Sequence, residues 1–147
     1  MRALKVLVVE DEPTNREVAE VILRSNGHEV VSVENGRVAL SLLETRRDFD
    51  LILMDVLMPE LDGLAATRLI RADPALGHIP IVVVSARASG SDRSAGLAAG
   101  ADGYLTKPFK RGDLLAALAD ILGRKGVLSA DESIEMKESL RVARPPR

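Results

Sequence analysis

Several short, widely separated segments of the sequence carry the side chains that one small chemical site would need. They are three acidic residues, a hydroxyl residue, a tyrosine and a lysine: Glu10, Asp11, Asp55, Ser85, Tyr104 and Lys107. The carboxylates suit a hard divalent cation, which prefers oxygen ligands. The hydroxyl and the ammonium can donate hydrogen bonds to phosphoryl oxygens. A carboxylate can also attack phosphorus and form an acyl phosphate.

The elements that position these residues are predicted from an alternation along the chain. Apolar runs typical of buried strands lie at residues 4–9, 28–33, 50–54, 80–84 and 101–105. Segments with helical spacing lie between them or follow the last, at residues 14–26, 36–46, 63–72, 90–99 and 111–123. This alternation predicts βαβ units and a parallel sheet. Groups just past the carboxyl ends of such strands share one crevice, so the scattered residues are expected to cluster in space.

Composition limits the class of protein. The 147 residues are 46% hydrophobic and 29% charged, which is ordinary for one globular domain. The formal charge of −2 argues against a generally basic nucleic-acid surface. The absence of cysteine excludes disulfides, thiol catalysis and cysteine-built zinc sites, and is typical of a reducing compartment. No apolar run approaches the ~20 residues of a membrane span, and the strand pattern at the N-terminus leaves no room for a secretory leader. A cytoplasmic protein without a membrane partner is expected.

Boundary signals divide the chain into a domain at residues 1–123 and a C-terminal tail at residues 124–147. Gly27 is predicted to end the first helix, and Gly123 the fifth. Ser129-Ala130-Asp131-Glu132 resembles a capping box, so a short extra helix is one interpretation of the tail. Its apolar residues form no clean stripe, however, and a solvated tail with a frayed end at residues 143–147 is preferred.

The fourth helical segment is unusual because residues 89–100 hold three glycines and three serines. Each glycine inside a helix costs roughly 1 kcal/mol relative to alanine. One interpretation is that small residues allow close packing on the sheet. The other is that a loosely held helix can be repositioned by a ligand event.

Each candidate residue also has a simpler explanation. The acidic pair could favour a helix dipole, Asp55 or Ser85 could cap a helix, and Lys107 could be a surface charge. Their shared position at strand ends favours one site instead. Three carboxylates in one crevice repel each other unless a cation lies between them, and Mg²⁺ is usually held by one or two carboxylates together with phosphate oxygens.

In order and spacing, these segments resemble the receiver domain of bacterial two-component response regulators over about residues 4–123. The motifs are Glu10-Asp11, Asp55 with Met58-Pro59 and Asp62-Gly63, Ser85-Ala86, and Lys107-Pro108. The resemblance implies an α/β flavodoxin-like, doubly wound (βα)5 fold with five parallel strands in the order 2-1-3-4-5.

The resemblance also implies the roles of the site residues. Asp55 would accept a phosphoryl group from a phosphohistidine on a histidine kinase or a histidine phosphotransfer protein, or from a small donor such as acetyl phosphate. Mg²⁺, or Mn²⁺, would be held by Glu10 and/or Asp11, by Asp55 and by the backbone carbonyl of Leu57. Lys107 and Ser85 would bind phosphoryl oxygens, and the Lys107–Pro108 bond would be cis.

Switching is implied as well. Phosphorylated Asp55 would draw in the Ser85 hydroxyl, and Tyr104 would rotate inward. The surface formed by residues 90–99, 101–105 and 111–123 would then change toward a downstream protein target. Such a protein catalyses only its own phosphorylation and dephosphorylation. Leu57 offers no polar group to guide an attacking water and Arg87 could cover the site, so slow self-dephosphorylation is expected.

Alternatives remain open. The leading interpretation is a stand-alone receiver with no DNA-binding domain; the chain could also be a module of a hybrid histidine kinase or of a larger response regulator. A Mg²⁺-dependent aspartyl phosphatase would need a second aspartate where Leu57 stands. A pseudo-receiver would lack Asp55 or Lys107. A flavin-binding protein would need a phosphate loop after the first strand, where residues 10–13 would repel phosphate.

Overall fold

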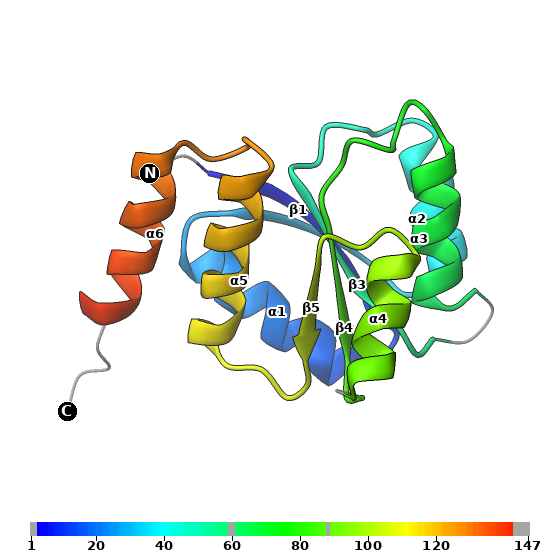
Figure 1. Cartoon of the computed structure of the whole chain (residues 1–147), viewed down its shortest axis with the longest axis horizontal. Helices are drawn as coiled ribbons and strands as arrows, with labels where there is room; N and C mark the ends of the chain where they lie inside the picture. Colours follow the sequence, from blue (N-terminus) through cyan, green and yellow to red (C-terminus); the bar gives the residue numbers. More distant parts are fainter. Residues whose placement is uncertain (1–2, 59–60, 88, 143–147) are drawn as a thin grey trace.

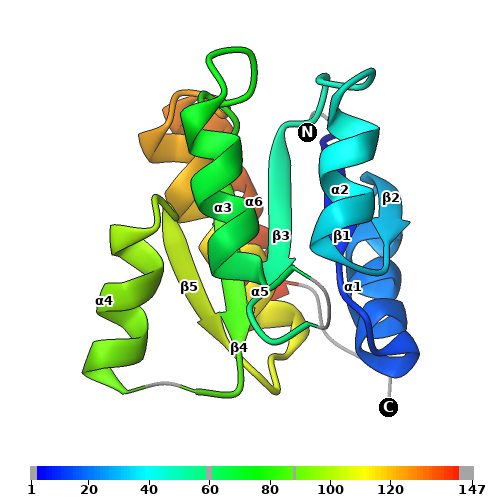
Figure 2. The same cartoon turned by 90° about the vertical axis from the view of Figure 1, so that its right-hand side faces the viewer.

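A computed structural model describes residues 3–58, 61–87 and 89–142. In these residues five strands and six helices follow one another along the chain. They are β1 (Lys5–Val9), α1 (Pro13–Ser25), β2 (Glu29–Val33), α2 (Gly36–Leu43), β3 (Leu51–Asp55), α3 (Gly63–Ala72), β4 (Ile81–Ser85), α4 (Gly90–Ala98), β5 (Gly103–Thr106), α5 (Arg111–Arg124) and α6 (Ala130–Val142). All neighbouring strands pair in parallel, in the order β2-β1-β3-β4-β5, so the predicted fold is confirmed (Figure 1 shows the whole chain, and Figure 2 labels all of these strands).

Helices cover both faces of the sheet, and the strands divide their side chains between the two (Figure 2). Val6 and Val8 of β1 belong to a core cluster with residues of α1 and α5. Leu7 and Val9 belong to the second cluster, which is closed by α2 and α3. Successive strand side chains point to opposite faces, so a strand that is buried on both faces needs an uninterrupted apolar run. This is why the strand sequences show so little polar alternation.

The ends of α1 and α5 test the two predicted glycine boundaries. Gly27 follows the C-cap residue Asn26 with a φ of +87°, a conformation that glycine adopts without steric cost, and the prediction is confirmed. The prediction for Gly123 is wrong, because α5 continues to Arg124. A Cβ atom on Gly123 would lie 2.6 Å from Ser133 Oγ, so the missing side chain makes room for the next helix.

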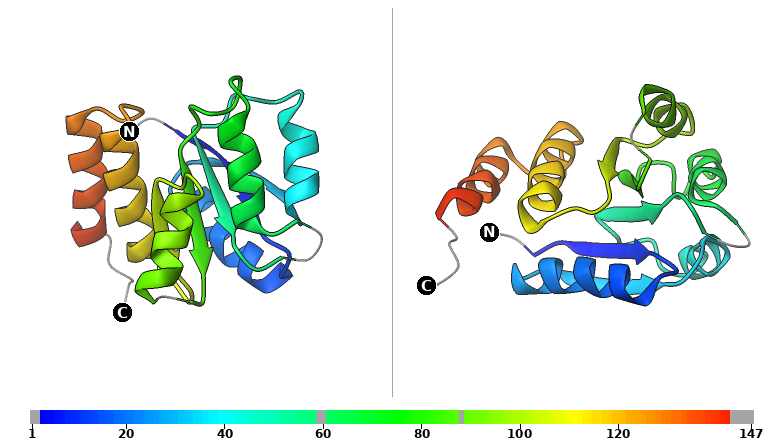
Figure 3. Two further views of the ribbon diagram at one scale, coloured as in Figure 1. Left: turned by 45° about the vertical axis from the view of Figure 1, so that its right-hand side comes forward. Right: turned by 90° about the horizontal axis from the view of Figure 1, so that it is seen from below.

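Helix α6 lies along α5, on the side away from α4 (Figure 3). Leu128 and Met136 are buried in the core cluster that α5 helps to form. Ser133 Oγ donates a hydrogen bond to the Ala119 carbonyl at 3.1 Å, and Lys137 Nζ lies 2.7 Å from an oxygen of Asp120. The preferred expectation of a solvated tail is therefore wrong for this helix. Residues 143–147, expected to fray, lie outside the described residues.

The docking of α6 escaped prediction because its burial depends on the neighbouring helix. Met136 is 1% exposed while Ile134, two positions earlier, is 53% exposed. Among the residues of α6 whose side chains the structure describes, 130–138, Met136 is the one buried apolar side chain, and one such side chain leaves no stripe in the sequence of a helix. Within the described ranges, none of the helices has both the length and the apolar character that a bilayer crossing requires.

Candidate functional site

Four neighbouring strands bring the predicted residues to one edge of the sheet. Glu10 follows the last residue of β1, while Asp55 and Ser85 are themselves the last residues of β3 and β4. Lys107 follows the last residue of β5. Because the strands are parallel and adjacent, their carboxyl ends meet, and residues about a hundred positions apart become neighbours.

Lys107 reaches across this edge to two carboxylates. Its Nζ lies 2.8 Å from Glu10 Oε1 and 3.2 Å from Asp55 Oδ1. Its backbone N–H donates to the Ser85 carbonyl at 2.8 Å, which extends the pairing of β5 with β4. The side chain is 18% exposed, so the surface-charge interpretation is wrong. The Lys107–Pro108 peptide bond is cis, as the resemblance implied.

The acidic residues form a cluster at the same edge. One carboxylate oxygen from each of Glu10, Asp11 and Asp55 lies within 4.8 Å of the others. Glu10 and Asp55 are buried, and Asp11 is partly exposed. The N-cap of α3 is Asp62, whose side chain accepts from the Ala65 N–H, so Asp55 does not cap that helix.

Burial and the neighbouring charges set the protonation behaviour of this cluster. Burial, and then the charge of Glu10, raise the pKa of Asp55 to about 7, while the Lys107 ammonium opposes the rise. For Lys107, burial alone would lower the pKa. The hydrogen bond to Glu10 and the charges of Asp55 and Glu10 outweigh that effect, and the pKa of Lys107 is raised above its usual value. The ammonium therefore stays charged, and one positive group faces an excess of carboxylates.

Ser85 and Tyr104 are linked through one residue of the loop after β4. Ser85 is 1% exposed, and its Oγ accepts a hydrogen bond from the Arg87 N–H at 3.1 Å. The Tyr104 hydroxyl donates to the Arg87 carbonyl at 2.8 Å. The N-cap of α4 is Ser89, with a capping box to Asp92, so the capping interpretation of Ser85 is wrong.

Comparison with known proteins decides the family. The sequence model described as the response regulator receiver domain matches residues 6–119. The chain belongs to this family. Receiver domains are parts of signalling proteins rather than classical enzymes, and this receiver carries the predicted motifs at the strand ends where the resemblance put them. Pro59, named with one of those motifs, lies outside the described residues.

Similar proteins include both sequence relatives and solved structures. The response regulator MprA of Mycolicibacterium vanbaalenii is 43% identical over 121 residues, which are 82% of this receiver and 51% of MprA. The solved receiver domain of the sensor histidine kinase PA1611 of Pseudomonas aeruginosa is 43% identical with a TM-score of 0.76, covering 83% of this chain and 99% of that one. That structure has a magnesium ion coordinated in its active-site cleft. The chemotaxis response regulator CheY4 of Vibrio cholerae has a TM-score of 0.77 at 32% identity, covering 82% and 99%.

This chain is shorter than the curated relatives that it matches. This chain spans about half the length of the curated relatives that it matches. The expectation of a stand-alone receiver without a DNA-binding domain therefore stays a prediction.

The donor set of the receiver fits a hard cation. Glu10, Asp11 and Asp55 offer only oxygen ligands, and they leave negative charge that the Lys107 ammonium does not balance. Mg²⁺ accepts such ligands while keeping several waters. Leu57, whose backbone carbonyl is a further predicted ligand, lies two residues past the end of β3 with a half-exposed side chain.

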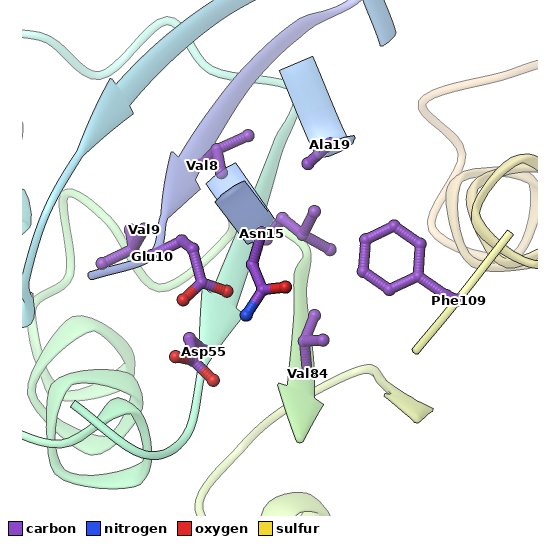
Figure 4. A pocket seen from close by; sticks show the side chains of 9 residues that line it. Val8, Val9, Glu10, Asn15, Ala19, Asp55, Val84 and Phe109 are labelled. Atoms are coloured by element: carbon purple, nitrogen blue, oxygen red, sulfur yellow. The ribbon is translucent and has the colours of Figure 1, made fainter. Parts of the chain in front are cut away.

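A small pocket opens beside the acidic cluster of the receiver (Figure 4). Its polar lining comes from Glu10, Asp55 and Asn15, and its apolar lining from Val8, Val9, Ala19, Leu53, Val84 and Phe109. Neither Asn15 nor Phe109 is predicted as a site residue from the sequence. Asn15 lies in the first turn of α1, and only the packing of that helix against β1 brings its amide to the strand end.

Proposed function

We propose that this receiver is a phosphoacceptor of a two-component system or phosphorelay, with Asp55 as the residue that takes the phosphoryl group. One observation carries the proposal: Asp55 is buried at a strand end, in contact with the Lys107 ammonium and beside the carboxylates of Glu10 and Asp11. The donor is a phosphohistidine of a histidine kinase or a histidine phosphotransfer protein, and a small acyl phosphate can replace it.

The transfer makes and breaks one bond to phosphorus. A carboxylate oxygen of Asp55 attacks the phosphorus of the phosphohistidine. The N–P bond breaks, its electron pair stays on the imidazole nitrogen, and that nitrogen takes up one proton from solvent. Charge spreads over the equatorial oxygens of the transferring phosphoryl group. The protein's task is therefore to position the reacting groups and to neutralise the charge on these oxygens.

Each site residue has one part in that task. Lys107 neutralises one phosphoryl oxygen with its ammonium, and the Ser85 hydroxyl donates to another. Mg²⁺, when bound by Asp55, Asp11, Glu10 and the Leu57 carbonyl, supplies positive charge for the remaining oxygen. The observations favour Mg²⁺, which a solved relative holds, and none of them favours Mn²⁺.

The proposed output is a change in the surface formed by α4, β5 and α5. When the Ser85 hydroxyl turns toward the phosphoryl group, the Arg87 N–H loses its acceptor. The Arg87 carbonyl is also the acceptor for the Tyr104 hydroxyl, so a shift of this loop reaches Tyr104 on β5. A downstream protein would recognise the altered surface. The only reactions catalysed are the receiver's own phosphorylation and dephosphorylation.

Labelling by a small donor tests the proposal directly. The protein is incubated with acetyl phosphate and Mg²⁺, and the intact mass is measured. A single phosphoryl adduct is expected in the wild type and in Asp131→Asn, an exposed aspartate of α6. Asp55→Asn should carry no adduct while its far-UV circular dichroism stays native. An adduct that persists in Asp55→Asn, or a wild type that no donor labels, overturns the proposal.

The length of the relatives favours a second arrangement, in which this receiver is one module of a hybrid kinase or a larger response regulator. The chemistry at Asp55 would be the same, and only the recipient of the signal would differ. A phosphatase that turns over small esters is disfavoured, because Leu57 stands where that chemistry needs a second aspartate.

A further inference from the structure

The Tyr104 side chain is held at both ends by α4 and the loop before it. A Cβ atom on Gly96 of α4 would lie 2.9 Å from Tyr104 Cδ2 and 3.2 Å from Cε2, so the ring packs directly on the helix backbone. At the far end of the ring, the hydroxyl donates to the Arg87 carbonyl at 2.8 Å. Helix α4 lies alongside β5 in both views of the ribbon (Figures 1 and 2).

Arg93 of α4 adds a third contact that bridges the helix and the strand. Its guanidinium carbon lies 5.3 Å from the centroid of the Tyr104 ring, within the range of a cation–π interaction. One of its terminal nitrogens donates to Thr106 Oγ1 at 3.0 Å. Thr106 and Tyr104 are two positions apart on β5 and so share one face of the strand. The guanidinium therefore spans from α4 over the ring to the strand beyond it.

In the part of the chain that the structure describes, no carboxylate pairs with this guanidinium. Among residues 3–58, 61–87 and 89–142, no acidic side chain forms an ion pair with Arg93. Asp92, its neighbour in sequence, is occupied by the capping box with Ser89. A planar guanidinium suits both stacking on an aromatic face and donation to a fixed oxygen.

We propose that Arg93 is a positioning residue that holds the Tyr104 ring between α4 and β5, so that the position of α4 on the sheet and the position of the Tyr104 ring change together. The contacts of the Arg93 guanidinium with the Tyr104 ring and with Thr106 are called the clamp below. The path continues toward Ser85, because the peptide groups of Arg87 accept from Tyr104 and donate to Ser85. The clamp itself needs no phosphorylation. Its consequence for signalling rests on the proposed function.

The composition of the chain provides a specific probe of the clamp. Tyr104 is the sole tyrosine, and there is no tryptophan, so tyrosine fluorescence reports on this ring alone. In Arg93→Ala the equilibrium constant between the clamped and the free ring should fall about two- to fivefold, which is the effect of losing an exposed cation–π contact. Acrylamide quenching of the emission should rise, and its anisotropy should fall. Arg93→Lys keeps a cation but not the planar fork, so it should restore part of the wild-type signal.

Two further variants complete the test. Arg68→Ala removes the same charge from an exposed position on α3 and should leave the Tyr104 signal unchanged. The Arg93→Ala effect should also persist in an Asp55→Asn background without donor or metal, so that failure of Asp55 to be labelled would not affect the result. The proposal is overturned if Arg93→Ala, with a native circular dichroism spectrum, quenches like the wild type. It is equally overturned if Arg68→Ala changes the signal as much.

Discussion

At the scale of single residues, His28 is a buried titratable side chain with one ring nitrogen that has no hydrogen-bond partner among the described residues. It is 4% exposed, and its Nδ1 accepts the Leu4 N–H at 3.1 Å, so the neutral ring carries its proton on Nε2. No partner for Nε2 is found in the part of the chain that the structure describes. Burial lowers the pKa of His28 below its usual 6.5, although the charge of Asp50 opposes this. If Nδ1 were protonated as well, its N–H would face the Leu4 N–H, and two hydrogen-bond donors would repel each other.

The lowered pKa of His28 predicts a loss of stability in acid. Below pH 6.5 the unfolded chain binds a proton that the native state still excludes, so the free energy of unfolding falls as the pH drops from 6.5 to the lowered pKa. One such group gives a slope of at most about 1.4 kcal/mol per pH unit. His28→Asn keeps an acceptor for Leu4 and should flatten this part of the profile in urea titrations. The exposed His78, changed to Asn, is the control, and an unchanged slope in His28→Asn would refute the prediction.

The apolar side chain of Leu57 predicts a long lifetime for the phosphorylated state. Its half-exposed side chain, two residues past Asp55, has no group that can orient a water for attack on the acyl phosphate. Leu57→Asn should speed loss of the phosphoryl group roughly tenfold, which is about 1.4 kcal/mol of barrier. The decay is followed by intact mass after removal of the donor. Leu57→Ala should decay like the wild type, and equal rates for Asn and Leu would exclude the explanation.

At the scale of elements, α4 shows why glycine content alone does not decide between a loose helix and a close-packed one. Gly96 is buried against Tyr104 and Val83, whereas a Cβ on Gly90 would meet nothing within 4 Å. Gly96→Ala should therefore destabilise the protein by about 1–3 kcal/mol, despite the roughly 1 kcal/mol that alanine gains in helix propensity. Gly90→Ala should be neutral or stabilising in the same urea titration. Stabilisation by both changes would favour the loose-helix interpretation.

The order and ends of most elements were predictable because their signals are local. The apolar runs that mark the strands and Gly27 at the end of α1 each act within a few residues. In a parallel sheet the carboxyl ends of the strands lie at the same edge. For this reason the edge of the sheet at which the candidate site lies could be predicted from the sequence. The side-chain contacts between different elements could not be predicted from the sequence. Lys107 lies closer to Glu10 than to Asp55, and Tyr104 donates to Arg87, because of side-chain geometry that no spacing rule contains.

At the scale of the whole molecule, α6 extends the core while the candidate site lies on other elements. The helix contacts α5 through Ser133 and Met136. The carboxylates and Lys107 lie at the carboxyl ends of the strands. Stability and phosphoryl acceptance should therefore respond separately to changes in α6.

Met136→Ala tests this separation. Truncating a buried methionine typically costs about 2–5 kcal/mol, and the free energy of unfolding should fall by about 2 kcal/mol, at the low end because α6 can undock and limit the loss. Ile134→Ala, on the exposed side of the same helix, should change it by less than about 0.5 kcal/mol. Labelling of Asp55 by acetyl phosphate should proceed at the wild-type rate in both variants at a temperature where both are folded. If Met136→Ala is as stable as the wild type, the packing of α6 contributes nothing to the stability of the core. If the folded Met136→Ala variant is labelled slowly, α6 and the site at the strand ends are coupled.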